Sequence, residues 1–171
     1  MNILIAYASK HGSTFEIAEA IADRLRQSSF RVAIRSVEEV YTTEVYDAVI
    51  IGSAVYMGRW MQEAQQFIEE NRDDFGRVPV WLFSSGPLGD ETEEGIGNPH
   101  NLDVLMALTK AEGHQIFDGR LDKERLGLGE KLVVSAVKVP YGDFRDWDAI
   151  RDWADTIAAG LVPVKTPTPT I

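Results

Sequence analysis

The chain has 171 residues, a net charge of −10 and no cysteine. This length suits one domain with a sizeable core, while the acidic balance argues against a general nucleic-acid binder, which needs a basic surface for the phosphates. The lack of cysteine excludes disulfides, thiolate metal sites and a cysteine nucleophile, and three scattered histidines give little support to any other metal site. No apolar stretch approaches membrane-spanning length, so we expect a cytoplasmic protein.

The first predicted elements are a buried strand, a helix and a second strand. Residues 3–8 are continuously apolar, as in a strand that helices cover on both faces. From 14 to about 27 the apolar residues instead recur at every fourth position, which predicts an amphipathic helix. Residues 31–35 carry a charge at each end and fit a strand nearer the edge of the sheet.

The turn between the first strand and its helix has the composition of a phosphate-binding loop. Gly12 lets the chain turn and approach a ligand closely, while Ser9, Ser13 and Thr14 add hydroxyl groups. Backbone N–H groups at a helix N-terminus have no partner within the helix, so they and the positive end of the helix dipole can bind an anion. A turn without a ligand, capped by Ser13 or Thr14, is the alternative.

The same alternation of strand and helix continues along the chain. The second buried strand leads into a loop over 53–60, and a helix begins at about Trp60, which we expect in the core. The third apolar strand is followed by a loop over residues 84–90, whose glycines permit close backbone approach to a ligand. Gly113 is expected to cap the following helix. These strands are predicted over 46–52, 78–83 and 115–119, and these helices over 60–71 and 102–110.

The C-terminal part combines an insertion, a helix and a tail. Residues 120–142 exceed an ordinary connection, and their apolar residues predict an inserted amphipathic helix with Leu126, Leu132, Val133, Ala136 and Val137. The last helix is capped by Asp146 and ends at Gly160. Proline and threonine alternate over 162–171, which predicts a disordered tail and leaves 1–161 as one domain.

Five strands that alternate with helices imply a parallel sheet with right-handed crossovers, an α/β fold of the doubly wound class. In such sheets ligands bind outside the carboxyl ends of the strands. The loops that follow the predicted first, third and fourth of the parallel strands therefore share one end of the sheet. This co-location favours a ligand at residues 9–14 over an empty turn.

The motif Ser9-Lys-His-Gly-Ser-Thr14 resembles the T-x-T-G-x-T phosphate loop of flavodoxins, with Ser for the first Thr and His11 for the second. The segments 52–60 and 146–154 and the insertion before the last helix are similar to one branch of the flavodoxin-like superfamily, which includes menaquinone-dependent protoporphyrinogen dehydrogenase. The likeness spans nearly the whole chain before the tail. It implies the strand order 2-1-3-4-5 and FMN as the cofactor.

The resemblance also implies which residues bind FMN. The first loop would hold the phosphate through N–H groups and hydroxyls, the second would line one side of the isoalloxazine, and the third would meet its pyrimidine edge or other side. Tyr56 is the expected ring contact, with an exposed loop aromatic as the alternative. His11 is expected to be a solvated loop residue and Arg59 a surface charge, and neither is given a catalytic role. The implied cofactor-binding residues are Ser9, Lys10, His11, Gly12, Ser13, Thr14, Ala54, Val55, Tyr56, Met57, Gly58, Ser84, Ser85, Gly86, Pro87, Leu88 and Gly89.

The implied function is an FMN-dependent oxidoreductase that passes electrons or hydride between a reduced donor and a quinone-type acceptor, with protoporphyrinogen oxidation as one candidate reaction. Residues 84–90 lack the aromatic with which electron-carrier flavodoxins usually cover the flavin, which would leave one face open to a flat substrate. The chemistry would then take place on the flavin, with no catalytic side chain and no metal.

Three other functions remain as alternatives. The first is a flavodoxin-type one-electron carrier that docks on redox proteins through its acidic surface. A receiver-like signalling domain would need an aspartate at the end of the third strand, where residues 51–53 read Ile-Gly-Ser. The third alternative is an interaction module, in which the fold has lost FMN.

The expected partners are a small redox substrate, either a quinone or a porphyrinogen, or else a redox protein, and not a nucleic acid. The apolar residues of the inserted helix suggest a lid or a contact with a membrane surface. Packing of that helix on its own domain, or on a second subunit in a homodimer, is the equal alternative. A peripheral position at the inner face of the membrane is thus a variant of the cytoplasmic location.

Overall fold

The computed structural model describes residues 1–86, 98–122, 124, 127 and 141–161. Within them a parallel sheet has the order β2-β1-β3-β5-β6, which confirms the predicted order 2-1-3-4-5, with β5 and β6 as the fourth and fifth parallel strands. The register places Ile5 of the central strand opposite both Ile34 and Ile50. The parallel strands are β1 (Asn2–Ala8), β2 (Arg31–Ser36), β3 (Ala48–Tyr56), β5 (Val80–Ser85) and β6 (Gly113–Phe117).

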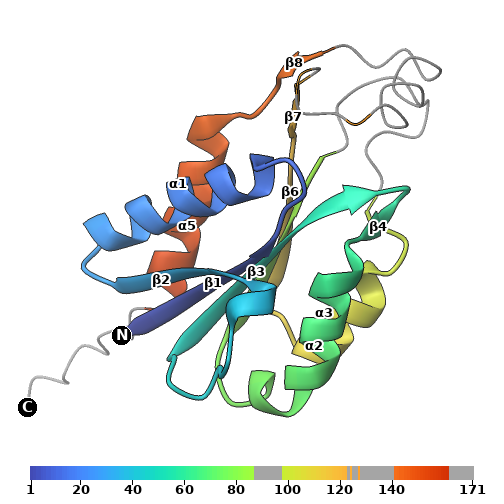
Figure 1. Ribbon diagram of the computed structural model, residues 1–171. Helices are drawn as coiled ribbons and strands as arrows, with labels where there is room; N and C mark the ends of the chain where they lie inside the picture. The colour runs from blue at the N-terminus through green and yellow to red at the C-terminus, as the bar shows by residue number, and fades with distance from the viewer. Residues whose placement is uncertain (87–97, 123, 125–126, 128–140, 162–171) are drawn as a thin grey trace, which may run out of the picture.

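Helices cover both faces of the sheet, as the predicted α/β class requires (Figure 1). One face carries α1 (Ser13–Gln27) and α5 (Trp147–Leu161), and the other carries α2 (Gln62–Phe75) and α3 (Leu102–Thr109). A 3-10 turn, η1 (Val37–Glu39), follows β2. Two helical layers around one sheet make a doubly wound sandwich.

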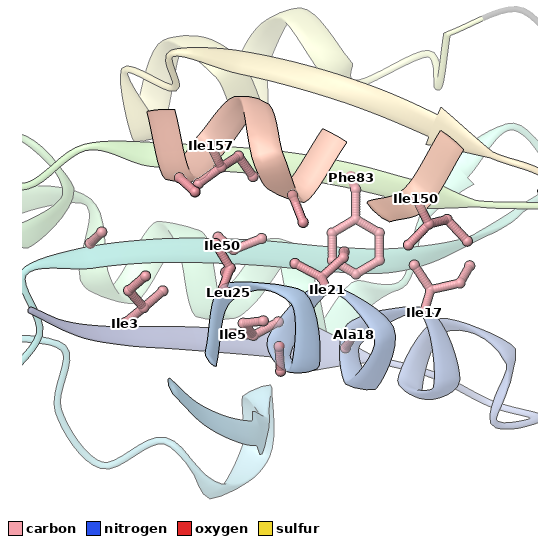
Figure 2. Close-up of a cluster of buried hydrophobic side chains, with 14 of the residues drawn as sticks. Ile3, Ile5, Ile17, Ala18, Ile21, Leu25, Ile50, Phe83, Ile150 and Ile157 are labelled. Atoms are coloured by element: carbon pink, nitrogen blue, oxygen red, sulfur yellow. The ribbon is translucent and has the colours of Figure 1, made fainter. Parts of the chain in front are cut away.

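Two hydrophobic clusters hold these layers together. Successive side chains of a strand point to opposite faces, so Ile3 and Ile5 of β1 pack against α1 and α5, whereas Leu4 and Ala6 pack against α2 and α3. Figure 2 shows the first cluster, in which Phe83 reaches from the sheet toward both helices. Strands buried on both faces explain the continuous apolar runs of the sequence.

The predicted loop over 53–60 is wrong, because these residues form a β-hairpin. Strand β3 continues to Tyr56, turns through Met57 and Gly58, and returns as the antiparallel strand β4 (Arg59–Trp60). Both turn residues have positive φ, 49° and 72°, as a type I′ turn requires. Helix α2 therefore begins at Gln62, two residues later than predicted.

The boundary after α3 also differs from the prediction. Lys110, with φ of 52°, ends the helix in the left-handed conformation, and its N–H donates to the Met106 carbonyl. Gly113 is not the cap but the first residue of β6, which ends at Phe117. Asp118 and Gly119, predicted within the last strand, lie beyond it. These two residues are thus free of the sheet and follow it toward its carboxyl edge.

The predicted cap of the last helix is confirmed. The Asp146 carboxylate accepts hydrogen bonds from the N–H groups of Asp148 and Ala149, each at 3.0 Å. Ahead of it, β7 (Arg120–Leu121) and β8 (Gly142–Asp143) form an antiparallel pair. The predicted inserted helix and the tail over 162–171 lie outside the described residues. Among the helices that are described, none has the length and apolarity needed to cross a membrane.

Candidate functional site

Four segments meet at the carboxyl edge of the sheet. The Gly86 N–H after β5 donates to the carbonyl of Phe117 at 3.0 Å. A Cβ placed on Gly119 would lie 3.4 Å from the Cα of Gly86 and 3.7 Å from Ser13 Oγ, so these three backbones approach closely. The predicted loops therefore come together, and residues 118–120 join them. Sequence reasoning had assigned no ligand role to this fourth segment, since it carries no motif.

The turn after β1 leads directly into the first turn of α1. Gly12 occupies the N-cap position with φ of 85°, and its N–H donates to Ser9 Oγ at 3.1 Å. The first intrahelical bond runs from Glu16 N–H to Gly12 C=O at 3.0 Å, so the N–H groups of residues 13–15 precede the hydrogen-bonded helix. The alternative cap by Ser13 or Thr14 is wrong, because both are already helical residues.

Among the described residues the hydroxyl of Thr14 has no hydrogen-bond partner, although Thr14 is completely buried. An unsatisfied buried polar group costs about 1–3 kcal/mol, which a ligand atom at this position would recover. Ser13 Oγ behaves differently, because it accepts the Arg120 N–H at 3.1 Å and so ties the turn to the segment after β6. Together these features suit an oxyanion with several acceptor oxygens.

An ion-pair network built around the buried Arg145 begins in the first turn of α1. Glu16 in the first turn of α1 accepts from Arg120 at 2.9 Å and from Arg145 at 2.7 Å. The side chain of Arg145 is 2% exposed, bonds Asp143 at 2.8 Å and stacks on the Trp147 ring at 4.4 Å. The Arg145 hydrogen bond holds the pKa of Asp143 below its ordinary value. Two guanidinium groups thus offset a carboxylate that would otherwise repel an anion at the helix N-terminus.

The hairpin places Tyr56 against the turn after β1. The Lys10 ammonium lies 5.4 Å from the centroid of the Tyr56 ring, and the His11 ring meets it edge-on with centroids 6.4 Å apart. Tyr56 nevertheless keeps 38% of its surface exposed. Tyr56 therefore lies beside the turn after β1 and remains exposed, so both its expected role as a ring contact and the alternative of an exposed loop aromatic stay predictions.

Beneath the hairpin runs a buried chain of polar groups. The Trp60 indole N–H donates to Ser84 Oγ at 2.8 Å, and Ser84 Oγ lies 2.7 Å from His114 Nε2. Burial lowers the pKa of His114 to about 4, so its imidazole is neutral at neutral pH. Trp60 is 2% exposed, as expected of a core residue. The Ser84 side chain is committed to this chain, so any ligand contact by Ser84 falls to its backbone.

The other predicted site residues differ in how they lie. Ala54 and Val55 are half-buried in β3, and Met57 at the hairpin tip is 98% exposed. Ser85 is buried, and Gly86, directly after β5, has a left-handed backbone conformation with φ of 75°. Pro87, Leu88 and Gly89 lie outside the described residues. Across the part of the chain that the structure describes, no three acidic or histidine side chains gather as a metal site would require.

Comparison with known proteins agrees with this architecture. The model of the family described as "Flavodoxin domain" matches residues 4–148. Protoporphyrinogen IX dehydrogenase [quinone] of Escherichia coli strain K12 is 26% identical over 172 residues, which cover 92% of this chain and 95% of that protein.

The solved structures that it resembles include two flavodoxins. One, from Streptococcus pneumoniae TIGR4, has a TM-score of 0.63 at 20% identity, with 94% of this chain and 100% of that chain covered. The other, from the domain Archaea, also has a TM-score of 0.63, at 15% identity and with 94% and 98% covered. At these identities the likeness shows a common fold.

Proposed function

Because this chain belongs to the flavodoxin domain family, we propose that it is an FMN-dependent oxidoreductase that passes electrons from a reduced donor to a quinone-type acceptor. The family implies FMN, which supplies one- and two-electron redox chemistry when bound. The protein's part is to bind the group, orient it and control access to it. We place the FMN-binding domain within residues 1–161.

The observation that carries this proposal is the buried, unpartnered hydroxyl of Thr14 beside the left-handed turn at Gly12. The N–H groups of residues 13–15 and this hydroxyl are the donors that a phosphate group needs. No cation has to contact the phosphate, since the positive end of α1 favours an anion and the nearby guanidinium groups already bind Glu16. The residues proposed to hold the phosphate are Ser9, Lys10, His11, Gly12, Ser13 and Thr14.

The ring system is proposed to lie between the hairpin and the segment after β5. Tyr56 offers a partly exposed aromatic face on the hairpin side. On the other side, a Cβ built on Gly86 would meet no atom of the described residues within 4 Å, which leaves room beside this backbone among them. Residues 54–58 and 84–89 are therefore proposed to contact the ring from its two sides.

An enzyme is favoured over a carrier by the extent of the likeness to a quinone-linked dehydrogenase, which covers 92% of this chain and 95% of that protein. The second candidate, a one-electron carrier, is supported by the flavodoxins of the same fold and by the net charge of −10. Stopped-flow reduction separates the two functions. Direct turnover with a quinone or porphyrinogen supports the enzyme, whereas reaction with partner reductases alone supports the carrier.

The substitution Thr14→Val tests the cofactor site, with Thr109→Val as its matched control. Both threonines are fully buried in helices, but Thr109 Oγ1 donates to the Leu105 carbonyl at 2.7 Å. We expect Thr14→Val to weaken FMN binding by roughly tenfold, the worth of one hydrogen bond to a charged group, without destabilising the protein in the absence of FMN. Thr109→Val should instead lower the thermal midpoint and leave FMN affinity unchanged.

Two measurements decide the outcome: the visible spectrum with added FMN, and a fluorescence titration of each variant. Failure of the wild-type protein to bind FMN would overturn the proposed function. Equal FMN affinity of the wild-type protein and Thr14→Val would show that the phosphate lies elsewhere.

A further inference from the structure

The hairpin register places Arg59 on the same face of the hairpin as Tyr56. Tyr56 pairs directly with Arg59, and Val55 pairs with Trp60. Side chains at directly opposed positions of antiparallel strands lie on the same face, about 5 Å apart. Trp60 and Val55 pack in the cluster under α2 and α3, so Tyr56 and Arg59 must point to the other face. There Tyr56 meets the turn after β1.

Arg59 differs from the other guanidinium groups at this edge. Arg120 and Arg145 are both held by Glu16. Arg59 is exposed, and within the described residues its side chain has no hydrogen bond, ion pair or ring contact. Its charge is therefore available to an incoming molecule. The Lys10 ammonium, 5.4 Å from the centroid of the Tyr56 ring, adds a second positive charge to the same rim, where it also has an interaction of its own.

The charge of this rim is opposite to that of the whole protein. At −10 the protein repels a distant anion, but salt screens that field beyond about 8 Å at physiological ionic strength. Close to the hairpin an anion instead meets Arg59. Met57, 98% exposed at the tip, adds apolar surface beside the Tyr56 ring. This combination fits a molecule with a flat apolar body and an acidic substituent.

We propose that Arg59 is a specificity-determining residue, which binds the carboxylate or similar anionic substituent of a conjugated redox substrate whose apolar body lies beside Met57 at the hairpin tip. The proposal rests on the proposed function, because it names the substrate class of the same site. It also accounts for an unpaired arginine beside an exposed methionine, which packing alone does not need.

Two quinones of similar ring size test the proposal. The anionic probe is 1,4-naphthoquinone-2-sulfonate and the neutral probe is menadione, each titrated by quenching of tryptophan fluorescence. For the wild-type protein, affinity for the anionic probe should fall as salt rises, against the trend set by a net charge of −10. Arg59→Gln should bind the anionic probe roughly fivefold more weakly at low salt, the upper end for an exposed charge pair, and bind menadione unchanged. Arg59→Lys should restore most of the loss.

Arg31→Gln is the matched control. Arg31 is also exposed and without a side-chain partner in the described residues. It is the first residue of β2 and therefore lies at the amino end of the parallel strands, whereas the hairpin lies at their carboxyl end. This variant removes the same charge far from the hairpin and should keep the preference for the anionic probe. Affinity that rises with salt, or an equal loss in Arg31→Gln and Arg59→Gln, would overturn the proposal. FMN titration of the same samples reports the proposed function separately, since FMN binding without a preference for the anion removes this inference alone.

Discussion

Replacing His114 by glutamine is expected to remove a loss of stability that the wild-type protein suffers between pH 6.5 and pH 4. Ser84 Oγ accepts the Trp60 indole N–H and lies 2.7 Å from His114 Nε2, to which its own O–H donates in the tautomer that carries the proton on Nδ1. Protonation of that nitrogen abolishes the acceptor and places a charge in a half-buried site. Glutamine keeps an oxygen acceptor for Ser84 but does not titrate.

The sign and size of the effect follow from the pKa of His114, which burial lowers from 6.5 to about 4. Because the folded-state value lies below the unfolded one, the unfolded chain takes up the proton first as the pH falls. The free energy of unfolding therefore decreases from pH 6.5 downward and levels off below about pH 4. At 1.36 kcal/mol per pKa unit the limit is about 3 kcal/mol, and we expect about 2 kcal/mol because solvent screens part of the ring.

Urea unfolding followed by circular dichroism measures this difference. Between about pH 7 and pH 4.5 the wild-type protein should lose about 2 kcal/mol more than His114→Gln. Carboxylates that titrate near pH 4 act in both proteins, so they cancel from the comparison. Parallel curves for wild type and His114→Gln would refute the reasoning, since they would mean that His114 takes up its proton equally in both states.

Two further substitutions test the packing around the site. In Gly52→Ala the new methyl group would lie 2.0 Å from the ring carbon Cζ of buried Phe83, so we expect a loss of at least about 1–3 kcal/mol, the usual cost of overpacking, measured as a lower thermal midpoint. Arg145→Met keeps the aliphatic stem but removes the hydrogen bond that Arg145 donates to Glu16. We expect a loss of about 3 kcal/mol, the lower end for a broken buried pair because Glu16 is partly exposed. In titrations FMN affinity should fall as well, whereas an unchanged affinity would show that the charge of Glu16 does not reach the phosphate.

The fold could be predicted because its central strands leave a strong pattern. Strands β1 and β3 are covered on both faces, so Ile3 to Ala6 and Ala48 to Ile51 are buried without a break and read as apolar runs. The helices beside them are amphipathic, so the change of period marks each boundary. The position of the turn at Gly12 could be predicted for the same reason, since it lies between two clear elements.

The hairpin and the ion-pair network could not be predicted from local sequence. Met57 adopts φ of 49° in a type I′ turn that usually carries Asn or Asp before Gly, so residues 53–60 lack the usual hairpin signature. Glu16 and Arg145 stand 129 residues apart, and no local pattern connects them. The signal that could have found this network is electrostatic, because a carboxylate in the first turn behind a phosphate loop requires a counter-charge from elsewhere in the chain.

Core packing and substrate recognition are joined in this hairpin by its register. A slip of one residue would exchange the two faces, exposing Trp60 and burying the charge of Arg59. The slip would forfeit the burial of a whole indole and its hydrogen bond to Ser84, and it would cost the desolvation of a guanidinium group. The buried bond from Trp60 to Ser84 therefore fixes the register that presents Arg59 beside Tyr56. Trp60 is buried and cannot contact a ligand itself, but it determines which side chains of the hairpin can do so.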